Sequence, residues 1–362
     1  MKIVTVLGTR PEIIRLSAII PKLDKYSEHI LVHTGQNSAS LLSDVFFQEF
    51  GLRAPDHHMG IVEPDFARQI GRIMSGCYDL FVKLRPDRLL ILGDTNSAFS
   101  SVVAKRLGIP VFHMEAGNRC FDPRVPEEVN RRVIDHSSDI LMPYTERSRQ
   151  NLLREGFPSD RVYVTGNPIH EIMSAHADRS DASDVLSRLA IVRGGYFLAT
   201  LHRAENVDVS DRLIKFVEAL QMLSQSHNLP VFVSTHPRTR ERLTAAKIVA
   251  TAQVYFMDPV GFVDFLTLEK HARCVLSDSG TVQEECSILG VPNVTLRDVT
   301  ERPETLECGS NILTGCDVNN IVTAVEIAAG GPPRWNPPPE YLAPAVSDTV
   351  VRIVMSYIHG LS

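Results

Sequence analysis

The chain has 362 residues, of which 44% are hydrophobic and 22% are charged, an ordinary composition for a globular protein and a length that suits two domains. Its formal net charge of −6 argues against nucleic acid as a general partner, although it permits a local basic pocket for an anionic ligand. No apolar run approaches the roughly 20 residues that span a bilayer, so no membrane partner is expected.

Residues 1–12, MKIVTVLGTRPE, contain an apolar core too short for a signal peptide, and they fit a first strand better. The cysteines show no CxxC pair and no zinc-like spacing, so we expect reduced thiols and no metal site. Reduced thiols are typical of a cytoplasmic protein. The six cysteines are Cys77, Cys120, Cys274, Cys286, Cys308 and Cys316.

The first half of the chain alternates short apolar runs with amphipathic segments, which predicts parallel strands covered by helices. A helix is expected after Pro11, because proline suits the first turn, and further helices are expected at 41–50, 64–84 and 145–155. The runs that we interpret as strands are residues 2–7, 29–33, 89–92, 111–114, 139–142 and 161–165.

Acidic side chains follow two of these strands. Asp94 and Glu115 come just after predicted strands, so both are expected at the carboxyl edge of the sheet, where open α/β sheets bind ligands. Glu127 follows soon after and can bring a third carboxylate to this edge, and three carboxylates at one edge predict proton transfer. Arg10 lies at the junction of the first strand and its helix and is expected over the same edge; a surface arginine bound to its own loop is the alternative.

Residues 174–187 are small, polar and acidic, and we place the boundary between two domains, 1–170 and 171–346, near residues 166–183. The second domain repeats the alternation, and the helix predicted at 347–360 has apolar residues that need a partner, so it is expected to pack back on the first domain. The predicted strands of the second half are 196–200, 231–235, 254–257, 274–276 and 292–296. We therefore predict an α/β fold of two doubly wound, Rossmann-like domains with a ligand cleft between them.

Small residues lead from a strand into a helix at Ser279-Gly280-Thr281, where exposed backbone N–H groups would suit a diphosphate. Glu285 lies one turn later and can accept hydrogen bonds from ribose hydroxyls. An ordinary capped helix with a solvated acidic face is the alternative for this segment.

Three further side chains of the second half are candidate ligand contacts. The guanidinium of Arg302 suits phosphate oxygens, although a surface ion-pair network is the alternative. His202 and His236 each end a predicted strand, and their equivalent positions favour a functional role.

Several motifs of nucleotide enzymes are absent. No G-x-G-x-x-G follows a predicted strand, there is no P-loop, and no Tyr-x-x-x-Lys pair occurs. A hydride mechanism with a nicotinamide cofactor is therefore disfavoured.

Six motifs, which run in order from Lys2 to about Gly315, together resemble the non-hydrolysing UDP-N-acetylglucosamine 2-epimerases. The resemblance implies two Rossmann-like domains similar to the GT-B glycosyltransferases, and usually a homodimer. The motifs are Gly8-Thr9-Arg10-Pro11-Glu12, Gly93-Asp94-Thr95, His113-Met114-Glu115-Ala116-Gly117, Pro126-Glu127-Glu128-Val129-Asn130-Arg131, Ser279-Gly280-Thr281-Val282-Gln283-Glu284-Glu285 and Thr300-Glu301-Arg302-Pro303-Glu304.

By this resemblance, Asp94, Glu115 and Glu127 match the carboxylates credited with proton transfer at C2 of the sugar. Arg15 stands where the family often has Lys, and we include it with His236 among the substrate-binding residues. The other matches are His202 and Arg10 near the diphosphate, Ser279, Gly280 and Thr281 in the phosphate-binding turn, Arg302 on a phosphate, Glu285 on the ribose and Phe265 near the uracil.

Two segments depart from the commoner family pattern. Residues 35–39, GQNSA, replace a segment that in several bacterial members contributes to an allosteric site, which argues against activation by substrate. Residues 117–122, GNRCFD, are similar to members acting on related UDP-N-acetylhexosamines, including those that make UDP-N-acetyl-L-fucosamine.

The expected reaction is epimerisation at C2 of a UDP-N-acetylhexosamine, with polysaccharide biosynthesis as its setting. Because C2–H has no adjacent carbonyl, UDP must leave C1 first or nearly so, which gives a bound 2-acetamidoglucal. Re-addition to the opposite face inverts C2, and neither a metal nor a redox cofactor is required. A hydrolysing epimerase, a GT-B glycosyltransferase and a UDP-sugar-binding regulator are the alternatives.

Overall fold

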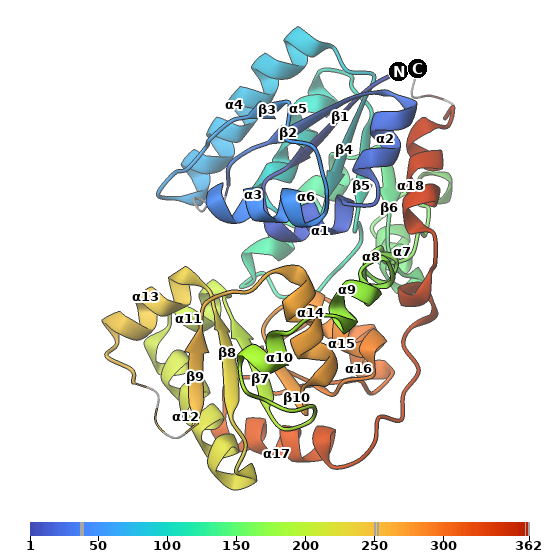
Figure 1. Cartoon of the computed structure of the whole chain (residues 1–362). Helices are drawn as coiled ribbons and strands as arrows, with labels where there is room; N and C mark the ends of the chain where they lie inside the picture. The colour runs from blue at the N-terminus through green and yellow to red at the C-terminus, as the bar shows by residue number, and fades with distance from the viewer. Residues whose placement is uncertain (37–39, 250, 252, 359, 361–362) are drawn as a thin grey trace. The chain divides into compact units, whose positions relative to one another are not determined.

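The computed structural model describes residues 1–36, 40–249, 251, 253–358 and 360, and the chain forms two compact units (Figure 1). The first unit comprises Met1–Ile172 together with Glu340–Ser362, and the second comprises Met173–Pro339. The chain therefore leaves the first unit once and returns to it at its end. The predicted division into a domain of residues 1–170 and a domain of residues 171–346 stays a prediction.

The first unit is built on a six-stranded parallel sheet with the order β3-β2-β1-β4-β5-β6. Most of its strands are nearly continuous apolar runs because helices cover both faces of the sheet. The order reverses between β1 and β4, and ligands of such sheets bind where neighbouring strands diverge at this point. The strands are β1 (Lys2–Leu7), β2 (Glu28–His33), β3 (His57–His58), β4 (Arg88–Leu92), β5 (Val111–Met114) and β6 (Ile140–Met142).

The longest helix of the first unit, α4 (Phe66–Leu84), shows why these segments are helical. The side chain of Asp65 caps its first turn, and Ile73, Cys77 and Phe81 recur at the spacing that buries one face. The other helices are α1 (Arg10–Leu16), α2 (Ile20–Tyr26), α3 (Ser40–Glu49), η1 (Asn96–Phe99), α5 (Ser100–Arg106), α6 (Pro126–His136), α7 (Glu146–Arg154), η2 (Ser159–Arg161), η3 (Pro339–Leu342) and α18 (Val346–Met355), and α8 (Ile169–Ala175) runs across the limit between the units.

The C-terminal helix α18 belongs to the first unit, where it contacts α2. Val350 and Val354 are fully buried, and Lys22 of α2 donates to the hydroxyl of Ser347 over 2.6 Å. Arg88, at the start of β4, donates to the carbonyl of Val354. Apolar burial and these polar contacts together attach the end of the chain to its beginning.

The second unit has a six-stranded parallel sheet with the order β12-β11-β10-β7-β8-β9. Counted from its own first strand, this is the same topology as that of the first sheet. The strands are β7 (Phe197–Leu201), β8 (Val231–Thr235), β9 (Val254–Met257), β10 (Cys274–Ser277), β11 (Asn293–Thr295) and β12 (Asn311–Leu313). The predicted α/β fold of two doubly wound, Rossmann-like units is confirmed.

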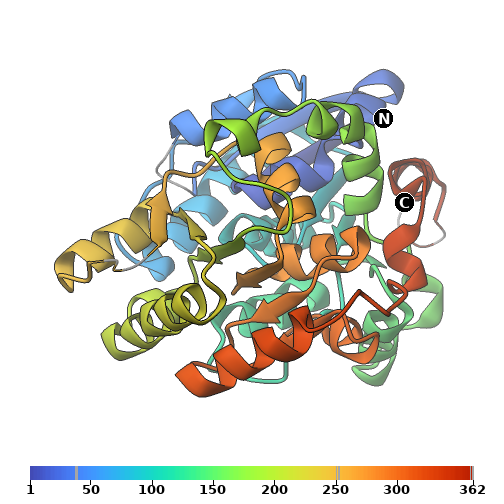
Figure 2. The same ribbon diagram turned by 60° about the horizontal axis from the view of Figure 1, so that its bottom comes forward.

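Helices α12 (Ser210–His227) and α17 (Val318–Ala329) lie side by side against the second sheet, as both views of the ribbon show (Figure 1, Figure 2). Phe216 and Leu220 of α12 and Ile321 and Val325 of α17 join the core that these helices close over the strands. The remaining helices are α9 (Ala177–Asp181), α10 (Val185–Arg188), α11 (Ala204–Val207), α13 (Pro237–Ala245), α14 (Phe262–His271), α15 (Gly280–Leu289) and α16 (Pro303–Glu307).

Some predicted elements differ from the structure. The strand expected at 161–165 is wrong: only one isolated bridge joins Leu141 to Val162, because β6 is short and is followed by Pro143, which has no N–H to continue a ladder. The region 174–187, for which no element was predicted, is largely helical, and the short strands β3 and β12 were not predicted either. Residues 37–39 of the segment 35–39 lie outside the described residues.

None of the described helices combines the length and the apolar character that crossing a bilayer would require.

Candidate active site

Two predicted carboxylates lie at the ends of neighbouring strands. Leu92 of β4 pairs with Met114 of β5, so Asp94 and Glu115 follow at the same edge of the sheet. Glu115 Oε1 lies 4.0 Å from the point where a Cβ atom on Gly93 would stand. The side chain of Glu115 is therefore directed over the end of β4.

The backbone of Glu115 is in the left-handed region, with φ at 65°. This conformation is uncommon for a residue other than glycine and costs about 1–3 kcal/mol, so it persists only where the surroundings impose it. A hydrogen bond from the Glu115 N–H to the carbonyl of Met142 (3.1 Å) holds it in place. Such strain is concentrated at functional sites, which adds weight to Glu115 as a candidate.

Each of the two carboxylates has a guanidinium partner. Arg15, only 2% exposed, forms an ion pair with Glu115, and the ring centroid of Tyr144 lies 5.4 Å from the guanidinium carbon. Arg131 approaches Asp94 Oδ2 with Nε at 2.8 Å and Nη2 at 2.7 Å. The structure thus places Arg15, a predicted substrate-binding residue, beside a predicted catalytic carboxylate.

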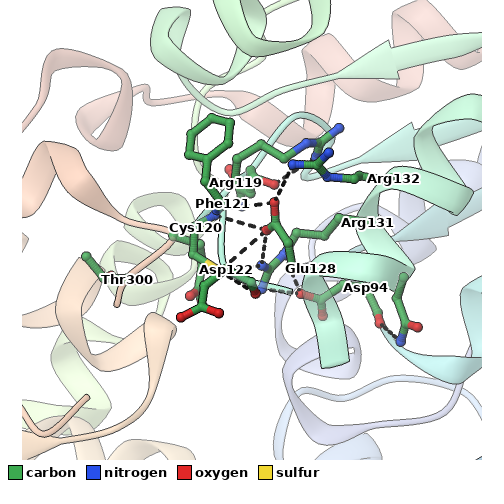
Figure 3. Close-up of polar contacts among 12 residues, drawn as sticks. Asp94, Arg119, Cys120, Phe121, Asp122, Glu128, Arg131, Arg132 and Thr300 are labelled. Carbon is green, nitrogen blue, oxygen red and sulfur yellow. Dashed lines mark hydrogen bonds and ion pairs between the residues drawn. The ribbon is translucent and has the colours of Figure 1, made fainter. Parts of the chain in front are cut away.

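Helix α6 begins close to this edge of the sheet and carries Glu127 in its first turn. The side-chain amide of Asn130 donates to the backbone carbonyl of Asp94 over 2.9 Å, and Arg131 from the same helix pairs with the Asp94 carboxylate (Figure 3). Glu127 is half-buried at the N-terminal end, where the helix dipole favours a negative charge. These contacts hold helix α6, which bears Glu127, against Asp94.

The loop that bears Arg10 is fastened to the Asp94 loop through Glu12. Glu12 Oε2 accepts hydrogen bonds from the N–H groups of Gly8 (3.0 Å) and Thr9 (2.8 Å), and Oε1 accepts one from the hydroxyl of Thr95 (3.0 Å). Burial raises the pKa of Glu12 to about 7, although the hydrogen bonds oppose this. Arg10 itself is exposed, and its guanidinium carbon lies 5.5 Å from the ring centroid of Phe46.

A buried network behind the strand ends fixes their backbone. The ring of His113 contacts the carbonyl of Gly93 through Nε2 and the carboxylate of Asp135 through Nδ1, both at 2.9 Å. Asp135 also accepts from the N–H of Gly117 and from Arg119 Nη2. Gly117 is required here, because a Cβ atom would stand 2.4 Å from the carbonyl oxygen of Ser148 and φ is 79°.

In the second unit, His202 follows β7 and is held by Asp278, which follows β10. Asp278 is fully buried and accepts from the backbone N–H groups of His202 and Arg203 (3.0–3.2 Å) and from the amide of Asn206 (3.1 Å). His202 Nδ1 lies 3.1 Å from Asp278 Oδ1, and the imidazole is 40% exposed. Burial would raise the pKa of Asp278, but the charge and hydrogen bond of His202, with the N–H of Arg203 and the amide of Asn206, lower it to about 2.

The Ser279–Thr281 turn opens helix α15 as predicted. A Cβ atom on Gly280 would stand 2.9 Å from Glu301 Oε1, so a side chain here would displace that carboxylate, and it would be in ordinary contact with the guanidinium carbon of Arg302 at 3.7 Å. Arg302 is 4% exposed and pairs with the buried Glu284. The predicted turn and the predicted arginine therefore lie together.

The other candidates of the second unit occupy separate elements. His236 caps α13, accepting from the N–H of Arg238 (3.2 Å), and follows β8, whose Thr235 pairs with Leu201 at the end of β7. Glu285 is 4% exposed on α15. Phe265 is half-buried on α14, packed against an apolar cluster rather than at a strand end.

Three residues that shape these sites were not singled out as functional by the sequence analysis, namely Glu12, Arg131 and Asp278. Glu12 had a usable signal, since Thr-x-x-Glu before a helix is a capping box, which the structure contains. Arg131 also had one, because a charged residue occupies a core position of an amphipathic helix.

A cavity of about 560 Å³ opens between β3 and α4, and none of the predicted site residues lines it. Within the described part of the chain, no three or more His, Cys, Asp or Glu side chains are grouped so that they could hold a metal ion.

A chain of two doubly wound α/β units, with functional groups at the strand ends of each, has the architecture of the GT-B class. The sequence profile of the UDP-N-acetylglucosamine 2-epimerases matches residues 22–355. The chain therefore belongs to the UDP-N-acetylglucosamine 2-epimerase family, as its motifs predicted.

Similar proteins agree with this assignment. The UDP-N-acetylglucosamine 2-epimerase of Methanocaldococcus jannaschii is 39% identical over 93% of this chain and 95% of its own. The crystal structure of the Methanocaldococcus jannaschii enzyme in complex with UDP-GlcNAc and UDP superimposes with a TM-score of 0.93 at 38% identity, covering 98% of this chain and 99% of that one. The UDP-2,3-diacetamido-2,3-dideoxy-D-glucuronate 2-epimerase of Pseudomonas aeruginosa is 36% identical over 91% of this chain and 93% of its own.

Proposed function

We propose that the protein interconverts UDP-N-acetylglucosamine and UDP-N-acetylmannosamine by epimerisation at C2. The observation that carries the proposal is the pair of strand-end carboxylates, Asp94 and Glu115, each beside a guanidinium, in a chain of this family. The choice of UDP-N-acetylglucosamine as substrate is based on the names of the similar proteins.

The proposed chemistry begins at C1. The C1–O bond breaks with its electron pair going to UDP, and the developing oxocarbenium acidifies C2–H. A carboxylate then removes this proton, which leaves 2-acetamidoglucal and UDP bound. Protonation of C2 from the opposite face and return of the UDP oxygen to C1 give the epimer, so no atoms are gained or lost.

The first unit supplies the groups that move protons. Asp94, Glu115 and Glu127 are assigned to this role, and a positioned acid or base of this kind contributes about 10²–10⁴-fold to a rate. Arg15 is buried and forms an ion pair with Glu115, and this contact orients the Glu115 carboxylate. Arg10, exposed at the start of α1, is assigned to the diphosphate.

The second unit supplies the groups that bind UDP. The Ser279-Gly280-Thr281 turn is assigned to the diphosphate: the N–H groups at the start of α15 suit its oxygens, although the Ser279 N–H donates to the Ser277 hydroxyl over 2.9 Å. The cation near this turn is Arg302. His202 is assigned to the diphosphate and the departing oxygen, because Asp278 directs Nδ1 inward and leaves Nε2 as its outer nitrogen. Glu285 is assigned to the ribose, Phe265 to the uracil and His236 to the nucleotide.

Three further properties extend the proposal. The protein acts as a homodimer, as members of the family usually do. It resides in the cytoplasm, where nucleotide sugars serve as precursors, and its product feeds polysaccharide biosynthesis. Gel filtration with light scattering tests the first of these properties, and cell fractionation tests the second.

Isotope exchange tests the proposed function directly. The protein is incubated with UDP-N-acetylglucosamine in deuterated water, and we expect deuterium at C2 of both epimers. Release of free N-acetylmannosamine without UDP-N-acetylmannosamine would indicate a hydrolysing enzyme, and transfer only with an added acceptor would indicate a glycosyltransferase. No exchange at C2 with this sugar or with other UDP-N-acetylhexosamines would contradict the proposal.

A further inference from the structure

The buried face of α6 carries charged residues where an ordinary amphipathic helix has apolar ones. Glu128 and Arg131 are each 3% exposed and Asp135 is fully buried, and their spacing places them along one face. Burying a charge is costly unless it is paired and hydrogen-bonded. These residues must therefore be matched by specific partners.

Arg131 joins two carboxylates. Its Nε and Nη2 atoms lie 2.8 Å and 2.7 Å from Asp94 Oδ2, and Nη1 donates to Glu128 Oε2 over 3.1 Å (Figure 3). Two nitrogens of one rigid guanidinium thus approach a single oxygen of Asp94. The planar fork limits rotation of that carboxylate about its last bond, which a flexible ammonium group would not do.

Glu128 binds the end of the Arg131 guanidinium that does not contact Asp94, and it also holds the turn after β5. It accepts hydrogen bonds from the N–H groups of Cys120 (3.0 Å) and Phe121 (3.3 Å), and Phe121 has a left-handed backbone with φ at 57°. Burial alone would raise the pKa of Glu128, but the Cys120 N–H and the Arg131 charge outweigh it and lower the pKa. Glu128 is therefore a charged anchor at neutral pH.

We propose that Arg131 is a positioning residue for the C2 epimerisation, which holds one oxygen of Asp94 so that the carboxylate meets C2–H at a fixed angle. This inference rests on the proposed function. A base must lie within hydrogen-bond reach of the proton that it removes, and a displacement of about 1 Å can cost about 10²-fold in rate. Arg131 acts through Asp94 and need not touch the substrate.

A merely structural ion pair would behave differently from a positioning residue. If the pair only stabilised the fold, its removal would lower the melting temperature while the folded fraction kept its kcat. If Arg131 positions Asp94, kcat falls in fully folded protein, whereas KM and the Kd for UDP stay near their wild-type values. The split between kcat and KM therefore separates the two roles.

The experiment compares wild type with Arg131→Ala, Arg131→Lys and Arg132→Ala. Arg132 is the matched control, because it also pairs with Glu128 (3.3 Å) but is 51% exposed and belongs to the adjacent position on the helix. We expect C2 deuterium exchange to fall about 10²-fold in Arg131→Ala and to change little in Arg132→Ala. Millimolar guanidinium should restore part of the Arg131→Ala rate, and methylammonium should not.

The results distinguish this inference from the proposed function. Absence of exchange in wild type contradicts the function itself. If wild type exchanges and Arg131→Ala matches it, the inference is wrong. If Arg131→Ala does not fold, the Arg131→Lys variant tests the inference, because lysine retains the positive charge but lacks the planar guanidinium fork. A lower kcat of Arg131→Lys with unchanged UDP affinity supports the positioning role, and a wild-type kcat overturns it.

Discussion

The two units have the same topology but use an equivalent position in opposite ways. Asp94 follows the fourth strand of the first sheet, and Asp278 follows the fourth strand of the second. The side chain of Asp94 is 22% exposed and is held by another side chain, Arg131. Asp278 is completely buried and is held mainly by backbone N–H groups of the loop after β7.

Under the proposed assignment of Asp94 to proton transfer, one strand end serves chemistry and its equivalent in the other unit serves architecture. A carboxylate that contacts a substrate must keep part of its surface accessible, so the residues that orient it can contact it from one side only. The Asp278 carboxylate is surrounded by hydrogen-bond donors and fixes the loop that carries His202, so its oxygens are occupied by these hydrogen bonds. We therefore expect substitutions at the two positions to separate activity from stability.

The largest expected effect is on the rate of Asp94→Asn. Because an amide cannot take up the proton, kcat for C2 exchange should fall about 10²–10⁴-fold, whereas the Kd for UDP should stay unchanged. Deuterium incorporation and calorimetric UDP binding measure the two quantities. Asp79→Asn, an exposed position on α4, is the control, and turnover of Asp94→Asn equal to that of the control would exclude Asp94 as a proton-transfer group.

Asp278→Asn should instead lower the stability. Since the pKa of Asp278 is lowered from 3.8 to about 2, its carboxylate contributes about 2 kcal/mol to the free energy of unfolding at neutral pH. The contribution is fully present above the unfolded value near 3.8 and is lost as the pH falls toward 2. The difference between wild type and variant should therefore shrink below pH 4 in denaturant titrations.

The control for Asp278→Asn is Asp298→Asn in the same unit. Asp298 is 46% exposed and pairs with Arg212 at the surface, so its loss should change stability by about 1 kcal/mol or less. Equal destabilisation by the two variants, or a difference that does not vary with pH, would contradict the role given to Asp278.

The smallest expected effect concerns Glu12, a buried carboxylate that shows the opposite pKa shift to Asp278. Burial raises its pKa from 4.5 to about 7, so between these pH values the carboxyl is ionised in the unfolded chain but still protonated in the fold, and the protein becomes less stable as the pH rises from 4.5 to 7. Thr95→Val removes a donor to the charged form and should destabilise by about 1 kcal/mol at pH 8, and by less at pH 5.5.

Thermal unfolding at the two pH values checks the Thr95→Val prediction. Thr244→Val, an exposed position on α13, should show no such dependence on pH. An equal loss for Thr95→Val at the two pH values would mean that Glu12 is charged throughout this range, and a larger loss at pH 5.5 would contradict the raised pKa of Glu12.

The fold could be predicted from the sequence where the pattern of a short segment alone indicates its secondary structure. β1, β4 and β5 are short apolar runs that end in small or polar residues, and burial on both faces imposes that pattern. β3 has only two residues and β12 only three, so neither leaves a run to recognise. Residues 161–165 have strand-like composition, but whether they pair depends on the short neighbouring strand β6, which their own sequence does not reveal.

The site was predictable to the extent that topology brings strand ends together. Asp94 and Glu115 follow from that rule, but the partners of these carboxylates do not. Arg15 is 100 residues from Glu115 and Arg131 is 37 residues from Asp94, so packing alone decides these pairs. The role assigned to His236 rests on its place at a strand end, and those assigned to Phe265 and Glu285 rest on the family resemblance. Like the roles of Asp94 and Glu115, they stay predictions.

The return of the chain to its first unit has a consequence for synthesis in the cell. Helix α18, whose Val350 and Val354 are fully buried, is synthesised after the whole second unit, whereas its partner α2 is synthesised before that unit. Residues 173–339 can complete their own core while the N-terminal unit still waits for its final helix. An early stop codon before residue 346 would therefore leave the N-terminal unit, which carries the proposed acid–base carboxylates, with an uncovered apolar surface, exposed to chaperones and proteases.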